Sequence, residues 1–398
     1  MENFKTIIGH IHKFLLTIYN FLAPVLVPIG RFFRFLYINV WTKIPFSTRA
    51  VGLLYVAVFI TGMITGLSFG GLLTWSLHFF GVWAILALAN VPSIQSGTGP
   101  NFALPIGIVS GLLAMVLVLA MNVMGWMFIL LSAVLAIIFG SMTGFLYGKL
   151  MNAVKGSEMA IAPYTGFAIT AIFGLVWLTL PIYHPNMIFF LGDGLRHQIP
   201  LDYFGANLII SNLWQFQIPS LAITLGGSTF STGVLTIRTG ELLVVFAACF
   251  LMWLFFRTKT GISISAVGRN PMFAKASGID VNRSRVIANM ISTAVAAFGI
   301  VIYAQSFGFV QLYDFPLFMA FPAIACILVG GATGQRARVM NVIVGTFLFQ
   351  GLLALALPVF TRVLAETDVG GVVNQIRMIV QNGIILYALA LMARGAKQ

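Results

Sequence analysis

Few residues of this 398-residue chain could carry out covalent chemistry, and none has the spacing of a catalytic motif. The five histidines are His10, His12, His78, His184 and His197. They form no H-E-x-x-H pair, and the chain contains neither a G-x-S-x-G elbow nor a Walker A loop. Both cysteines lie inside apolar runs, which is typical of neither a disulfide framework nor a metal site. The sequence therefore predicts no catalytic residue, no metal and no cofactor.

The composition predicts an all-α polytopic membrane protein. Apolar residues make up 60% of the chain and charged residues only 8%, whereas a soluble domain carries about a quarter charged residues. The net charge of +13 does not indicate nucleic-acid binding, because the basic residues lie between apolar segments, where they set the topology. The N-terminal 25 residues lack the features of a cleaved signal peptide.

Apolar stretches of membrane-spanning length predict about ten transmembrane helices. They cover residues 50–67, 70–91, 103–122, 125–148, 159–183, 240–256, 286–306, 318–335, 341–360 and 374–393. The stretch 206–237 is apolar but interrupted by Pro219, Gly226 and Gly227, and we interpret it as a broken or re-entrant segment. If it crosses the membrane, the count changes by one.

The charge bias of the loops predicts the orientation. With a cytoplasmic N-terminus and ten spans, 18 of the 22 basic residues fall on the cytoplasmic side, as the positive-inside rule requires. Both termini are then cytoplasmic. Residues 1–47 carry apolar side chains at helical spacing and predict an amphipathic helix lying in the membrane interface. The alternative is an eleventh span at about 14–30. Residues 48–398 form the transmembrane domain.

Ionisable groups within the spans are scarce. All nine acidic residues fall in loops or at span ends. His78 lies inside the second span and Arg377 about one turn into the last, and we interpret both as packing or interface residues. Ion-coupled carriers usually place charged groups at mid-membrane. The chain therefore resembles a transport path that has no energy source of its own, which favours a separate protein that supplies the energy.

The loop 257–285, on the predicted cytoplasmic side, contains a short capped helix. Asn270 is the predicted cap, Pro271 the first helical residue and Gly278 the C-terminal stop. Its apolar face would carry Met272, Phe273 and Ala276. Such a helix suits docking into a groove of another protein, and the alternative is a connecting helix that packs on its own bundle.

The motif Ala266-Val267-Gly268-Arg269-Asn270-Pro271, followed by Ala274, Gly278 and Ile279, resembles the coupling loop of bacterial ABC importer permeases. The most similar branch carries ribose, galactose, autoinducer-2 and nucleosides, and it is related to branched-chain amino-acid permeases. The resemblance extends to Gly330-Gly331, Gly345-Thr346 and the pair Gly144 and Gly148. It is good over about 255–395, weaker over 90–170 and absent over 1–47. Phe273 replaces a usual alanine, and the usual acidic residue near 101 is an asparagine.

This resemblance implies a type II-like ABC importer permease bundle in the bacterial inner membrane. A cytoplasmic ATPase dimer would dock on the loop through Gly268, Asn270, Pro271, Phe273, Ala274, Gly278 and Ile279. A second permease subunit, identical or homologous, would complete the pore, and an extracytoplasmic solute-binding protein would deliver the solute. The permease makes no covalent bond, and a simple sugar or a nucleoside is the expected solute.

The substrate path is predicted at the break in residues 92–107, where Asn101 and Phe102 would face a cavity. The alternative is a surface loop between two spans. Two other functions compete with the importer permease. An ion-coupled secondary transporter needs a charged group at mid-membrane, and a lipid-modifying enzyme needs a His/Asp/Glu cluster at one interface.

Overall fold

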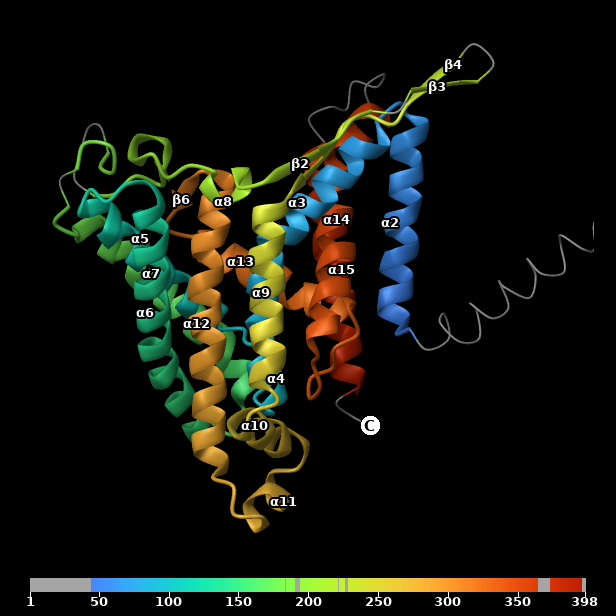
Figure 1. Cartoon of the computed structure of the whole chain (residues 1–398). Coiled ribbons are helices and arrows are strands. Elements are labelled where there is room, and N and C mark those ends of the chain that lie inside the picture. Colours follow the sequence, from blue (N-terminus) through green and yellow to red (C-terminus); the bar gives the residue numbers. More distant parts are fainter. Residues whose placement is uncertain are drawn as a thin grey trace, which may run out of the picture.

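The structure, a computed structural model, describes residues 44–182, 184–189, 194–220, 222–225, 228–363 and 373–395. The helices run mostly along one axis and form a bundle, with strands gathered at its upper end in Figure 1. The predicted interfacial segment 1–47 lies outside the described residues as far as residue 43, and the first described helix begins at Phe46.

The elements follow one another along the chain as a series of helices interrupted by short strands. The helices are α2 (Phe46–Ile64), α3 (Phe69–Leu88), α4 (Asn90–Gln95), α5 (Leu104–Ala120), α6 (Gly125–Ala153), α7 (Glu158–Thr179), η2 (Asp202–Phe204), α8 (Ile209–Asn212), α9 (Thr239–Phe255), α10 (Lys259–Arg269), α11 (Pro271–Ala276), α12 (Val281–Phe307), α13 (Phe315–Val329), α14 (Val339–Val363) and α15 (Val373–Gly395). The strands are β1 (Gln198–Pro200), β2 (Gln215–Ile218), β3 (Ala222–Leu225), β4 (Ser228–Ser231), β5 (Leu235–Arg238) and β6 (Phe309–Gln311).

Helix α12 lies at the centre of one half of the bundle, against α5 and α6. Glycines allow this close approach. A methyl carbon at Gly144 of α6 would lie 2.8 Å from the Met290 Cα, and one at Gly107 of α5 would lie 2.5 Å from the Thr293 carbonyl oxygen. Small residues let helix backbones pack closely, which is how membrane helices associate without a hydrophobic driving force.

Helices α2, α3, α13 and α14 form the other half. Here α13 and α14 meet at the glycines that carry part of the family resemblance. A methyl carbon at Gly345 would lie 1.9 Å from the Cys326 carbonyl oxygen, and one at Gly330 would lie 1.8 Å from the Asn341 carbonyl oxygen. The two glycines therefore serve helix packing.

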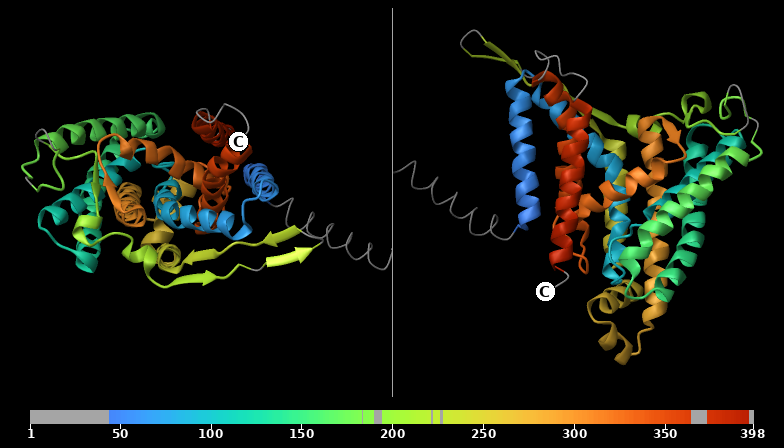
Figure 2. Two further views of the ribbon diagram at one scale, coloured as in Figure 1. Left: turned by 90° about the horizontal axis from the view of Figure 1, so that it is seen from above. Right: turned by 180° about the vertical axis from the view of Figure 1, so that it is seen from behind.

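The prediction of a broken or re-entrant segment at 206–237 is wrong. This stretch contains the short helix α8 and then two antiparallel strand pairs, β2 with β5 and β3 with β4. We call the strands β2 to β5 the ribbon. The ribbon runs along the upper end of the bundle in Figure 1, and the view from above in Figure 2 shows it following one side of the helices. The alternation of polar and apolar residues in β2 is that of a strand with two different faces. The described chain is therefore mostly, but not entirely, helical.

Each of the ten predicted spans overlaps one helix of the bundle. Within the described residues, six helices are long and apolar enough to cross a membrane, or seven if α9 and α10, bent by 76° at their junction, count as one span. The segments 104–120, 315–329 and 378–387 are shorter apolar helices. The chain is thus a polytopic membrane protein, and the count of about ten spans stays a prediction.

Candidate coupling site and its link to the polar core

The loop between α9 and α12 folds into two short helices, and their caps are those that the sequence predicts. Asn270 Oδ1 accepts a hydrogen bond of 3.0 Å from the Phe273 backbone N–H, and Pro271 is the first residue of α11. Gly278 ends the helix with φ of +79°, a left-handed conformation that glycine adopts without strain. The Ile279 N–H closes the terminus on the Ala274 carbonyl oxygen at 3.0 Å. The local prediction for this helix is confirmed.

Helix α11 projects from the lower end of the bundle in Figure 1. Met272 is 84% exposed and Phe273 is 67% exposed, whereas Ala274 is fully buried. Ala274 therefore anchors α11 to its own chain, whereas Met272 and Phe273 are apolar side chains on its exposed surface. A surface hollow of about 430 Å³ lies beside Met272, bordered also by Lys155 and the first residues of α12.

Helix α10 connects this exposed helix to the interior through its backbone. A methyl carbon at Gly268 would lie 2.1 Å from the Gln95 carbonyl oxygen and 3.0 Å from the Gly97 nitrogen, so α10 touches the end of α4 directly. The Ser265 hydroxyl donates to Gln95 Oε1, and Gln95 Nε2 donates to the Ala337 carbonyl oxygen. A displacement of α10 must therefore act on the end of α4.

The segment after α4 is a buried polar turn. The break predicted over residues 92–107 covers only residues 96–103, because α4 continues to Gln95 and α5 begins at Leu104. The Ser93 hydroxyl donates to the Gly99 carbonyl oxygen at 2.7 Å, and the Thr98 hydroxyl donates to the Ser93 carbonyl oxygen at 2.9 Å. These bonds add side-chain partners to backbone carbonyl groups at the end of α4 and in the turn, which is a requirement for irregular backbone inside a membrane protein.

Asn101, predicted to face the substrate path, is fully buried at the end of this turn. Its backbone N–H donates to Asn90 Oδ1 at 3.1 Å, and its side-chain amide donates to the Ser292 hydroxyl of α12 at 2.8 Å. Among the described groups, its Oδ1 accepts no hydrogen bond. Phe102 is half-buried, with its ring centroid 6.1 Å from that of Phe321. The role of both residues in transport stays a prediction.

Helix α12 follows α11 after the short connection 277–280 and is fixed at that end by a nearly buried ion pair. Arg285 Nη2 contacts Glu158 Oε1 at the start of α7. Asp280 caps the same end of α12 by accepting a 3.0 Å hydrogen bond from the Arg283 N–H. The ion pair, this cap and the contact with α6 together fix the start of α12. Helix α11 thus connects to the core both through α10 and through α12.

A second buried charged cluster lies at the opposite end of the bundle, and the sequence analysis did not predict it. Glu241, in the first turn of α9, is only 1% exposed. His78 Nδ1 lies 3.0 Å from Glu241 Oε2, Arg238 Nη1 lies 3.6 Å from Glu241 Oε1, and the Ser211 hydroxyl donates to the same carboxylate. The cluster joins α3, α8, α9 and the base of the ribbon. Arg238 lies three residues before Glu241, a spacing that allows an ion pair near the start of a span. This spacing was the signal in the sequence that could have predicted the cluster.

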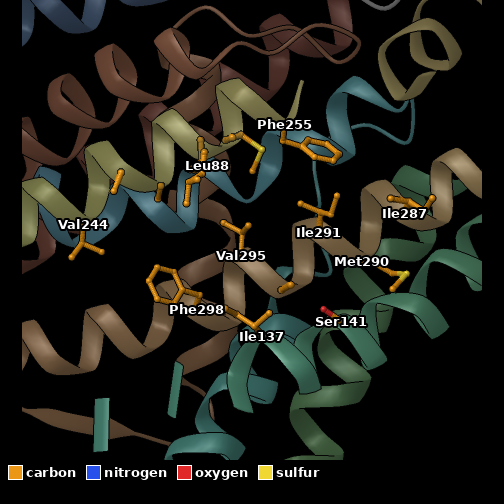
Figure 3. Close-up of a pocket in the computed structure, with 15 residues that line it drawn as sticks. Leu88, Ile137, Ser141, Val244, Phe255, Ile287, Met290, Ile291, Val295 and Phe298 are labelled. Atoms are coloured by element: carbon orange, nitrogen blue, oxygen red, sulfur yellow. The ribbon is translucent and has the colours of Figure 1, made fainter. Parts of the chain in front are cut away.

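A large pocket within the described residues is apolar and does not fit a polar solute. Figure 3 shows it between α9, α12, α6 and the end of α3, with Val244, Ile291 and Phe298 among its lining residues. Its volume is about 630 Å³, and Ser141 provides its single polar side chain. A site for a polar ligand needs several convergent polar groups, so this pocket suits a lipid chain or another apolar surface. Within the described residues, no group of three or more His, Cys, Asp or Glu side chains could hold a metal ion.

Comparison with known proteins agrees with this architecture. The family described as branched-chain amino acid transport system / permease component matches residues 72–389. The nucleoside ABC transporter permease protein NupB of Lactococcus lactis is 23% identical over 204 residues, half of each chain. The galactose/methyl galactoside import permease MglC of Haemophilus influenzae is 32% identical over 129 residues, which are 31% of this chain and 38% of the relative.

The autoinducer 2 import system permease LsrC of Shigella flexneri is 26% identical over 242 residues, 58% of this chain and 66% of the relative. The chain thus spans between 38% and 66% of the length of these relatives. No solved structure matches. Because the family match covers most of the sequence, including the loop 257–285, the chain belongs to the family of permease components of branched-chain amino acid transport systems.

Proposed function

We propose that this chain is the permease subunit of an ATP-driven importer, which moves a small polar solute across the bacterial inner membrane. The observation that carries the proposal is the geometry of α11. It is capped at both ends, exposes Met272 and Phe273, and continues into α10 and α12, which reach the buried core. A partner that moves α11 would thus move the segment around Asn101.

The partners follow from this geometry and from the family. An ATPase dimer would hold the α11 helices of two permease subunits, identical or homologous, and an extracytoplasmic binding protein would deliver the solute. The end that carries α10 and α11 would be cytoplasmic, because most basic residues of the loops gather there. Ten crossings then place both termini on that side, with α5 and α13 as short spanning helices.

A neutral polar solute suits the buried groups near the break. Asn90, Asn101 and Ser292 offer amides and a hydroxyl but no charge. The named relatives import a nucleoside, a galactoside or autoinducer 2. A simple sugar or a nucleoside is therefore the solute class that we propose, along a path that includes Asn101 and Phe102.

The test is the energy source of uptake. Right-side-out vesicles from cells that express the chain with its genomic neighbours are loaded with ATP and offered labelled sugars and nucleosides. We expect uptake that needs internal ATP, is blocked by vanadate and persists when an ionophore collapses the ion gradients. Uptake that ignores ATP and stops with the ionophore would contradict the proposal.

The same experiment decides on a second candidate, an ion-coupled secondary transporter. The buried His78–Glu241 pair favours this candidate, because a carboxylate beside a histidine inside the membrane is an arrangement that can carry a proton. The importer assignment is preferred because the family and the coupling helices agree with it, whereas the charged cluster also fits a structural clamp on the ribbon.

A further inference from the structure

A small basic pocket lies beside α10 and has no role in the function proposed above. Three arginines line it, Arg269 from α10 and Arg336 and Arg338 from the segment between α13 and α14. Gln95, Ser265 and Gln335 complete its polar wall. Its volume is about 170 Å³, which is below the roughly 300–1,000 Å³ of sites for drug-sized ligands. The pocket therefore suits a small group and not a whole nucleotide.

The backbone around the pocket is fixed by hydrogen bonds. Thr333 and Arg336 form a closed turn, in which the Thr333 N–H donates to the Arg336 carbonyl oxygen at 2.9 Å and the Arg336 N–H donates to the Thr333 hydroxyl at 3.2 Å. The Arg338 N–H donates to Asn341 Oδ1 at 2.8 Å, and Asn341 Nδ2 donates to the Gly330 carbonyl oxygen at 2.7 Å. The attachment points of Arg336 and Arg338 are thus set before any ligand binds.

Gln95 joins the three elements that form the pocket. It accepts from Ser265 of α10 and donates to the Ala337 carbonyl oxygen, which lies between the two loop arginines. A group bound in the pocket would therefore contact α10 and the 330–338 segment together and would brace the coupling helices against the bundle.

No described acidic side chain neutralises the positive charge of the pocket. All three arginines are exposed, and none of them belongs to an ion pair among the described residues. Three guanidinium groups around one small volume repel one another unless an anion lies between them. Guanidinium groups match the geometry of phosphate oxygens and bind them with charge-assisted hydrogen bonds.

We propose that this pocket binds a phosphate group, provided by the headgroup of an anionic phospholipid or by free phosphate. Its position beside the first residue of α14, where a membrane-spanning helix begins, brings it to the depth of lipid headgroups. Basic pockets between membrane helices at this depth are known recognition sites for anionic headgroups. The proposal stands independently of ATPase coupling.

The experiment uses the purified full chain in a neutral detergent. Thermal unfolding is followed while short-chain phosphatidylglycerol, short-chain phosphatidylcholine or inorganic phosphate is titrated in, with chloride at equal ionic strength as reference. The variants are Arg336→Gln combined with Arg338→Gln, and Arg269→Gln alone. The control is Arg283→Gln, an exposed arginine of the same basic loop that does not line the pocket.

We expect a saturable rise of Tm with phosphatidylglycerol that the double variant weakens by about tenfold or more, since one charge-assisted hydrogen bond can change affinity by such a factor. Arg269→Gln should weaken it as well, and Arg283→Gln should leave it within about twofold. Without anion, the double variant should be as stable as the unsubstituted chain or more stable, because a repulsion has been removed. This readout separates loss of binding from loss of folding.

The source of the phosphate follows from the same titrations. An equal response to inorganic phosphate identifies free phosphate, and a response to phosphatidylglycerol alone identifies the lipid headgroup. The proposal is overturned if neither probe gives a saturable rise, or if the double variant responds like the unsubstituted chain. It is also overturned if the only deficit of the double variant is loss of ATPase capture, which would assign the arginines to a carboxylate of the partner.

Discussion

Replacing Gly268 by alanine tests the contact through which α10 would act on the core. A methyl carbon at this position would lie 2.1 Å from the Gln95 carbonyl oxygen, whereas ordinary contacts begin at 3.4 Å. The obstacle is backbone, so no side-chain rotation relieves it, and the two segments must move apart by about the difference between these distances. At Gly268, even a methyl group forces α10 and the end of α4 apart.

The energy of this change can be bounded. Overpacking of a close contact costs about 1–3 kcal/mol. Replacing glycine by alanine inside a helix stabilises the folded state by about 0.5–1 kcal/mol. We therefore expect Gly268→Ala to lower the free energy of unfolding by roughly 0–2.5 kcal/mol. Because the displaced segment leads to Asn101, less solute should also be moved per ATP hydrolysed.

Gly174→Ala is the matched control. Gly174 lies inside α7, and a methyl carbon there would meet no atom within 4 Å. It should therefore raise the free energy of unfolding by about 0.5–1 kcal/mol, the opposite sign. Chemical denaturation in detergent measures both variants, and ATP-driven uptake measures coupling. If Gly268→Ala proved as stabilising as Gly174→Ala and transported normally, the contact between α10 and α4 would not exist as described.

Three further substitutions test the charged and capping groups. Glu241→Gln removes the charge that holds His78 and Arg238 together and should lower the free energy of unfolding by about 1.5–3 kcal/mol, measured by thermal unfolding. The control is Asp314→Asn, because the Asp314 side chain makes no cap bond, and it should change the free energy of unfolding by no more than about 0.5 kcal/mol. Glu158→Ala leaves the nearly buried Arg285 without its partner and should cost about 3–5 kcal/mol by the same assay. Asn270→Ala removes the cap of α11 at about 1 kcal/mol and should speed amide hydrogen exchange in α11 more than in α14.

The sequence predicted what is encoded locally. Apolar stretches of spanning length each overlap a helix, because a membrane helix must be apolar along its own length. The caps Asn270 and Gly278 act on backbone groups a few residues away, so residue type and spacing were sufficient. The motif around α11 is also a short stretch of sequence, so the family resemblance could be recognised from it. The family match over residues 72–389 agrees with that resemblance.

The remainder depends on contacts between distant segments. His78 and Glu241 are 163 residues apart, and each in isolation looked like a packing or span-end residue. Asn101 meets Ser292 across 191 residues, which no local pattern encodes. The ribbon at 215–238 was misinterpreted because its apolar content resembles that of a membrane segment, although the alternation in β2 already indicated a strand.

The most direct test of the central claim, that α11 docks an ATPase, is capture of that partner from the native membrane. The tagged chain is solubilised in mild detergent and compared with two variants, Met272→Asp and Met124→Asp. Met124 is the matched control, because it is also an exposed methionine (54%) but lies at the other end of the bundle. We predict a stoichiometric ATPase with the unsubstituted chain and with Met124→Asp, and its loss with Met272→Asp while the variant stays folded in the membrane. Equal capture by both variants, or no ATPase with any of them, would contradict the assignment of α11 as the coupling helix.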